Sequence, residues 1–171
     1  IGRLLLDTNS LPKEKLAELG TTLGADVPFF CFGGAAFVEG IGDRVSLYES
    51  FPKLSFLLIN PGFHVSTPWV YKQWDLQLTK KPCNARFRPL FRTLKEVVLS
   101  LSNDLETVAI SFHPEIARIK SVLVEANAMG ALMSGSGPTV FGIFENSPVR
   151  DKALDFISKS DSWRVFPAES V

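Results

Sequence analysis

Apolar residues recur along this chain at two spacings, and the two spacings separate helices from strands. Spacings of three and four residues predict helices over 11–24, 66–74, 87–101, 115–126 and 147–157, and a capped segment at 103–110 predicts one more. Continuous or alternating apolar runs predict strands over 35–39, 43–45, 54–60, 131–133, 139–144 and 163–166. The first two of these strands flank a glycine turn at 40–42.

From residue 54 onward the elements follow in the order strand, helices, strand, glycine loop, strand, helix, strand. This order is typical of an antiparallel sheet with helices on one face, the ferredoxin-like arrangement. The fold class expected from the sequence is therefore α+β.

The glycine loop joins two strand-like segments and contains the chain's clearest candidate for binding chemistry. It reads Ser134-Gly135-Ser136-Gly137-Pro138, and such a backbone can turn tightly while its N–H groups stay free. An anion, most often a phosphate, suits a loop of this kind. No lysine follows the second glycine, so the loop does not match the Walker phosphate motif. A plain hairpin turn of serine and glycine is the alternative.

Charge and composition exclude several classes of function. Lys and Arg together number 18, as do Asp and Glu, so no net field attracts nucleic acid or an anionic membrane. Cys31 and Cys83 belong to no Cys/His cluster, which disfavours a metal site and indicates a reducing compartment. No run of about 18 apolar residues and no secretory signal pattern occurs. The expected location is the cytoplasm.

Other polar residues could take part in chemistry, each with a structural alternative. Asp26 follows a predicted helix in apolar surroundings, where it could act as a general base or serve only as a turn residue. Thr67 and Tyr71 are four residues apart on one helix and could meet a flat polar ligand. They could equally be a helix start and a core aromatic. The pair Asn103-Asp104 is interpreted as a helix cap, with a role in a site as the lesser alternative.

Several stretches together resemble one enzyme family. They are Leu23–Phe30 with its Gly-Ala-Asp-Val-Pro block, Gly34–Gly42, Asn60–Gly62 with Ser66–Pro68, Asn103–Glu106 and Leu132–Thr139. The chain resembles the 4-diphosphocytidyl-2-C-methyl-D-erythritol kinases, which belong to the GHMP small-molecule kinases together with galactokinase, homoserine kinase and mevalonate kinase. The glycine loop alone would indicate only the superfamily, whereas the block around Asp26 narrows the resemblance to one branch.

The resemblance implies transfer of a phosphoryl group from ATP, with Mg²⁺ carried by the nucleotide, to the 2-hydroxyl of the cytidine substrate in the non-mevalonate isoprenoid pathway. It implies that Asp26 accepts or orients the hydroxyl proton, that Thr67 contacts the substrate and that Tyr71 packs on the cytosine ring. It also implies that Ser134, Gly135, Ser136 and Gly137 lie near the phosphates. The expected partners are a small-molecule substrate and ATP, without nucleic acid or membrane.

The resemblance further implies that residues 1–52 are the end of a GHMP kinase N-terminal domain and that residues 53–171 are its ferredoxin-like C-terminal domain. The lysine that pairs with the catalytic aspartate and the main ATP loop would then precede Ile1. A fragment of this kind is expected to be inactive alone, and a plant source would place it in plastids. The alternatives are another GHMP-type kinase and a non-catalytic ferredoxin-like ligand-binding module.

Overall fold

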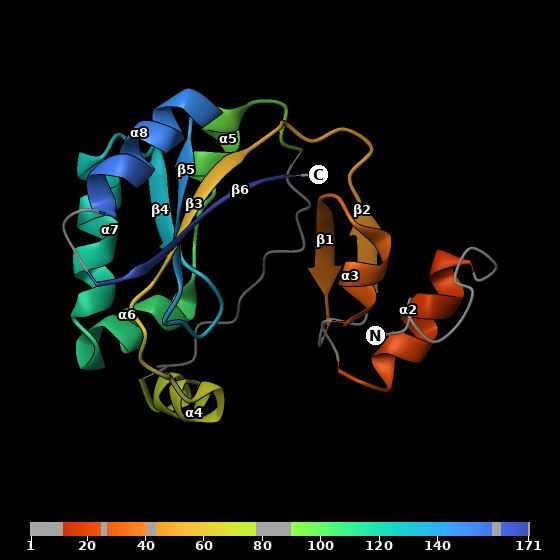
Figure 1. The fold of residues 1–171 in the computed structure, drawn as a ribbon. Helices are drawn as coiled ribbons and strands as arrows, with labels where there is room; N and C mark the ends of the chain where they lie inside the picture. The colour runs from red at the N-terminus through yellow and green to blue at the C-terminus, as the bar shows by residue number, and fades with distance from the viewer. Residues whose placement is uncertain (1–11, 25–26, 41–43, 78–89, 159–161, 171) are drawn as a thin grey trace. The chain divides into compact units, whose positions relative to one another are not determined.

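The computed structural model describes residues 12–24, 27–40, 44–77, 90–158 and 162–170 (Figure 1). The chain divides into two compact units, one ending at Phe51 and the other spanning Pro52–Ser170. The assignment of residues 1–52 and 53–171 to two kinase domains stays a prediction. Within the described ranges, no helix is both long and apolar enough to cross a membrane.

The first unit consists of two short helices and a hairpin. Helix α2 (Lys13–Thr21) confirms the predicted helix, and α3 (Val27–Phe32) follows it closely. A Cβ on Gly20 would lie 2.9 Å from Val27 Cγ1, so the approach of these helices requires glycine there. Strands β1 (Ala36–Glu39) and β2 (Arg44–Leu47) pair antiparallel, as predicted. Asp26, which precedes α3, lies outside the described residues.

The second unit is a four-stranded antiparallel sheet in the order β4-β5-β3-β6. Its strands are β3 (Ser55–Asn60), β4 (Gly130–Met133), β5 (Val140–Phe144) and β6 (Arg164–Glu169). Its helices are α4 (Thr67–Gln77), α5 (Leu94–Leu99), α6 (Asp104–Phe112), α7 (Glu115–Glu125) and α8 (Ser147–Ile157). With α8 between β5 and β6, this order is the predicted ferredoxin-like α+β arrangement.

One face of this sheet forms the core beneath α7 and α8 (Figure 1). Leu57, Val140 and Phe144 on that face are fully buried, and Ile119 and Leu123 of α7 pack against it. A Cβ on Gly142 would lie 2.9 Å from Leu123 Cδ2 and 3.2 Å from Ala128 Cβ, so glycine at this strand position favours the close approach of α7. The helix predicted over 115–126 is therefore confirmed as α7, with Ile116, Ile119 and Leu123 buried.

The expectation that helices cover only one face is wrong at one end of the sheet. Gly130 is paired with Ile143 and so lies on the face opposite Gly142. A Cβ on Gly130 would lie 2.9 Å from Val98 Cγ1, which places α5 against that second face. The helix predicted over 87–101 is described only at Leu94–Leu99, because Thr93 and Glu96 form a capping box that starts it there.

Candidate functional site

The glycine loop, residues 134–139, connects β4 to β5 and is held by its own backbone. The N–H of Ser134 donates to the carbonyl of Thr139 at 2.8 Å, and the N–H of Gly137 donates to the carbonyl of Ser134 at 3.0 Å. Gly135 and Gly137 have φ values of +56° and +85°. Both conformations favour glycine, so the two glycines of the motif are explained by the shape of the loop.

Two N–H groups of the loop point to a role in binding. Within the residues that the structure describes, the N–H groups of Gly135 and Ser136 donate no hydrogen bond to the protein. Ser134 and Gly135 are exposed and Ser136 is half-buried. Adjacent backbone N–H groups of this kind can bind the oxygens of an anion. The alternative of a hairpin turn also fits, because β4 and β5 pair antiparallel across this six-residue connection.

Thr67 lies against this loop although 69 residues separate it from Ser136. The two hydroxyl oxygens are 2.7 Å apart, and Thr67 is the first residue of α4. The structure thus brings together two of the predicted site regions. The N-terminus of α4 also adds a positive helix dipole end beside the loop.

Tyr71 is one helical turn after Thr67, on the same face of α4 by spacing. Its side chain is 50 % exposed, whereas the neighbouring Val70 is fully buried. The alternative of a core aromatic at Tyr71 is therefore wrong. Its contact with a ligand stays a prediction.

Asn103 both caps a helix and contacts the glycine loop, and the sequence analysis, which gave a role in a site as the lesser alternative, did not predict these loop contacts. Its Oδ1 accepts from the N–H of Leu105 at 3.0 Å, which confirms the predicted cap of α6. Its Nδ2 donates to the carbonyls of Met133 and Gly135, both at 2.8 Å. The signal was available, because an asparagine that caps through oxygen still has two amide hydrogens that need acceptors.

Glu106, in the first turn of α6, holds the same end of β4. Its Oε1 accepts from the N–H of Met133 at 2.9 Å, and its Oε2 pairs with Lys120 Nζ at 2.6 Å. At the other end of the loop, Asn60 Nδ2 donates to Thr139 Oγ1 at 2.9 Å. Side chains from α6 and β3 therefore fix both ends of the loop.

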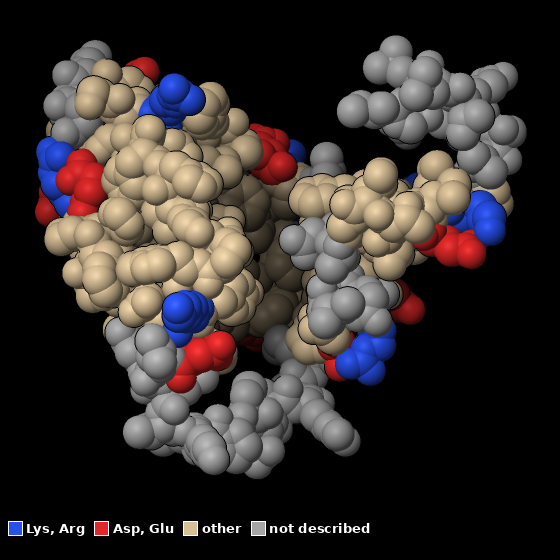
Figure 2. Space-filling view, turned by 90° about the horizontal axis from the view of Figure 1, so that it is seen from below, with Lys and Arg blue, Asp and Glu red and all other residues tan. Residues whose placement is uncertain are grey.

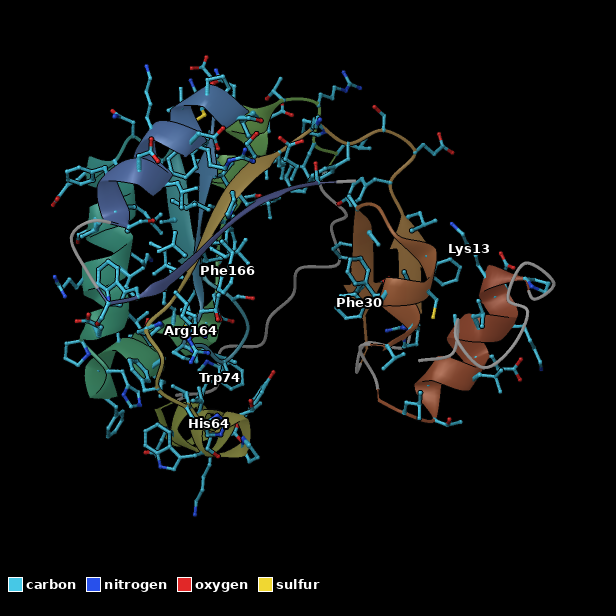
Figure 3. All side chains as sticks on the ribbon, in the orientation of Figure 1. Lys13, Phe30, His64, Trp74, Arg164 and Phe166 are labelled. Carbon is cyan, nitrogen blue, oxygen red and sulfur yellow. The ribbon has the colours of Figure 1, made fainter. Side chains whose placement is uncertain are left out.

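Seen from below, most of the described surface is made of uncharged residues, with lysine, arginine, aspartate and glutamate side chains in small groups (Figure 2). His64 is exposed in the segment before α4, as expected for a loop residue (Figure 3). Across the described ranges, no group of three or more His, Cys, Asp or Glu side chains could hold a metal ion. The site therefore offers amide and hydroxyl groups to a ligand.

Comparisons with known proteins agree on one family. The sequence model described as GHMP kinases C terminal matches residues 87–161. The 4-diphosphocytidyl-2-C-methyl-D-erythritol kinase of Syntrophus aciditrophicus is 46% identical over 157 residues, which are 92% of this chain and 56% of that protein. The enzyme of the same name from Geobacter sulfurreducens is 44% identical, over 90% of this chain and 54% of that protein.

A solved structure of a kinase with the same activity in its title also matches this chain. The crystal structure of a 4-(cytidine 5'-diphospho)-2C-methyl-D-erythritol kinase superposes with a TM-score of 0.70 at 29% identity. The match covers 90% of this chain and 56% of that protein. The chain thus spans about half the length of the relatives that it matches.

Proposed function

We propose that the chain carries the C-terminal domain of a GHMP-type kinase and forms one side of a site that transfers a phosphoryl group from ATP, because residues 87–161 match the sequence model described as GHMP kinases C terminal. The proposed acceptor is the 2-hydroxyl of 4-diphosphocytidyl-2-C-methyl-D-erythritol. The names of relatives that are 46% and 44% identical over about nine-tenths of the chain support this choice of substrate. The proposed site residues are Asp26, Thr67, Tyr71 and the loop from Ser134 to Gly137.

The observation that carries the proposal is the shape of the glycine loop. The N–H groups of Gly135 and Ser136 are without a protein acceptor in the part of the chain that the structure describes, and the α4 N-terminus lies beside them. Phosphate oxygens are acceptors that such N–H groups bind. Fixed donors of this kind stabilise charge on a transferring phosphoryl group without reorganising.

The other proposed residues act on the substrate. Asp26 would accept or orient the proton of the substrate hydroxyl, while Tyr71 would pack on the cytosine ring. The loop donors suit ATP phosphates. Mg²⁺ is commonly held by substrate phosphates with only one or two carboxylates, so it would come with the nucleotide and neutralise phosphate charge there. The expectation that this chain alone has no kinase activity stays a prediction.

Calorimetric titration of the chain with ATP and Mg²⁺, and separately with CDP, tests the proposal. The variant Gly135→Val disturbs the loop through its backbone, because φ is +56° and no atom lies within 4 Å of the added Cβ. Gly33→Val is the matched control, since Gly33 has φ +72° and equally open space but lies in the first unit.

We expect Gly135→Val to weaken ATP binding and Gly33→Val to leave it unchanged. Equal affinities for ATP in the two variants would contradict a phosphate role for the loop. An absence of binding to both ATP and CDP would favour the alternative of a ligand-binding module without catalysis. Tight ATP binding without CDP binding would favour a GHMP-type kinase that acts on another small molecule.

A further inference from the structure

We propose that Asn103 is a positioning residue that turns the glycine loop toward its anion. This inference rests on the proposed phosphate role of the loop. It assigns Asn103 a function beyond the helix cap, through the two hydrogen bonds that its amide donates to loop and strand carbonyls. The residue itself would not touch the phosphate.

The first step of the argument is the direction of one peptide group. Among the described peptide bonds, only Gly137-Pro138 is cis, so the peptide between Gly135 and Ser136 is trans. In a trans peptide the carbonyl and the N–H point in opposite directions. Because the Gly135 carbonyl points to Asn103 Nδ2, the N–H of Ser136 points away from Asn103. That N–H is one of the two donors offered to the anion.

The second step concerns the strand that leads into the loop. Asn103 also holds the carbonyl of Met133, so the N–H of Ser134 points the other way and meets the carbonyl of Thr139. The N–H of Met133 is held by Glu106. The first turn of α6 therefore fixes both backbone groups of Met133, the last residue of β4.

The third step is electrostatic. Two carbonyl oxygens with partial negative charge would repel a phosphate if they faced it. Asn103 engages both of these oxygens, those of Met133 and Gly135. Glu106 brings a full negative charge near the loop, and Lys120 pairs with it at 2.6 Å. The carbonyls of Met133 and Gly135 are thus hydrogen-bonded to Asn103, and the N–H groups of Gly135 and Ser136 remain as donors for the anion.

Two substitutions separate this role from the helix cap. Asn103→Ser and Asn103→Asp both keep a good N-cap oxygen, but neither donates an amide hydrogen to two carbonyls. Asn146 provides the matched controls Asn146→Ser and Asn146→Asp, because it caps α8 by accepting from the N–H of Val149. No described hydrogen bond joins Asn146 to the glycine loop.

The test compares the five proteins in two measurements on the full 171-residue chain. The first is amide hydrogen exchange by NMR at Ser134 and Gly137, whose N–H groups make the internal bonds of the loop. The second is titration with inorganic pyrophosphate, followed at the amides of Gly135 and Ser136.

We expect faster exchange at both loop amides in the two Asn103 variants, with helix amides of α6 still protected. Pyrophosphate affinity should fall about tenfold in both, as expected when hydrogen bonds that fix a donor are lost. The Asn146 variants should match the wild type in both measurements. Weaker binding in Asn103→Asp alone would show charge repulsion and would overturn the proposal.

Unchanged loop exchange in Asn103→Ser would also overturn it. If pyrophosphate fails to bind the wild type, the proposed phosphate role loses its support, and the exchange rates alone decide whether Asn103 positions the loop. The failure of the function and the failure of the positioning role are therefore distinguishable.

Discussion

Substitution of Gly137 by alanine tests the packing behind the glycine loop. A Cβ at this position would lie 2.7 Å from Met133 Sδ and 3.4 Å from its Cγ, and Met133 is itself buried. The φ of +85° adds backbone strain, which costs about 1–3 kcal/mol in a residue other than glycine. Overpacking of a filled core costs about 1–3 kcal/mol more. We expect a total loss of roughly 2–6 kcal/mol, the sum of these two ranges.

Gly135→Ala is the matched control, because it shares a positive φ but places its Cβ in open space. We expect it to lose only the backbone part, about 1–3 kcal/mol, in urea unfolding. A second variant, Met133→Val, removes the sulfur that the new Cβ would meet. The double variant Met133→Val with Gly137→Ala should therefore lose less unfolding free energy than the sum of the two single variants. Equal losses for Gly135→Ala and Gly137→Ala, together with strict additivity, would refute the reasoning.

Three further predictions concern single carboxylates and the exposed tyrosine. A hydrogen bond from the Ser147 hydroxyl and pairing with Lys53 lower the pKa of Glu169 from 4.5 to about 2. The stabilisation that Glu169 provides should be present above pH 4.5 and be lost as the pH falls through 2, so the difference between the unfolding curves of Glu169→Gln and wild type should be larger at pH 6 than at pH 2. Glu106→Leu leaves the N–H of Met133 without its acceptor and should cost about 1–3 kcal/mol in urea unfolding, while Glu106→Gln keeps an acceptor and should cost less; equal costs would contradict this. Tyr71→Ala should change the unfolding free energy by less than about 0.5 kcal/mol yet weaken CDP binding, and an unchanged CDP affinity would remove Tyr71 from the proposed site.

The strands and most helices could be predicted because each depends on a local pattern. The apolar run predicted at 54–60 forms β3, in which residues 55–60 alternate between buried and half-buried, and Asn146 caps α8 two residues before Pro148. The start of α5 was misjudged because apolar spacing continued upstream of Thr93, whereas the capping box fixed the start of the helix. Its place on the second sheet face follows from Gly130, which only the strand pairing reveals.

The candidate site was predicted in its parts but not in its connections. The two glycines of the loop could be recognised from the sequence. Both have a positive φ, which residues other than glycine rarely adopt. The contact of Thr67 with Ser136 joins residues 69 apart, which no local pattern contains. The hydrogen bonds from Asn103 to the carbonyls of Met133 and Gly135 were not predicted, because the helix cap already accounted for the residue.

A site-resolved titration with pyrophosphate tests the central claim most directly. The account predicts saturable shifts of the Gly135 and Ser136 amide signals, which lie where N–H donors are free among the described residues. Amides of the hairpin β1-β2, in the other unit, should serve as an internal reference and stay unchanged. Shifts that are absent from the loop, or that spread equally over both units, would contradict a phosphate-binding role for the glycine loop.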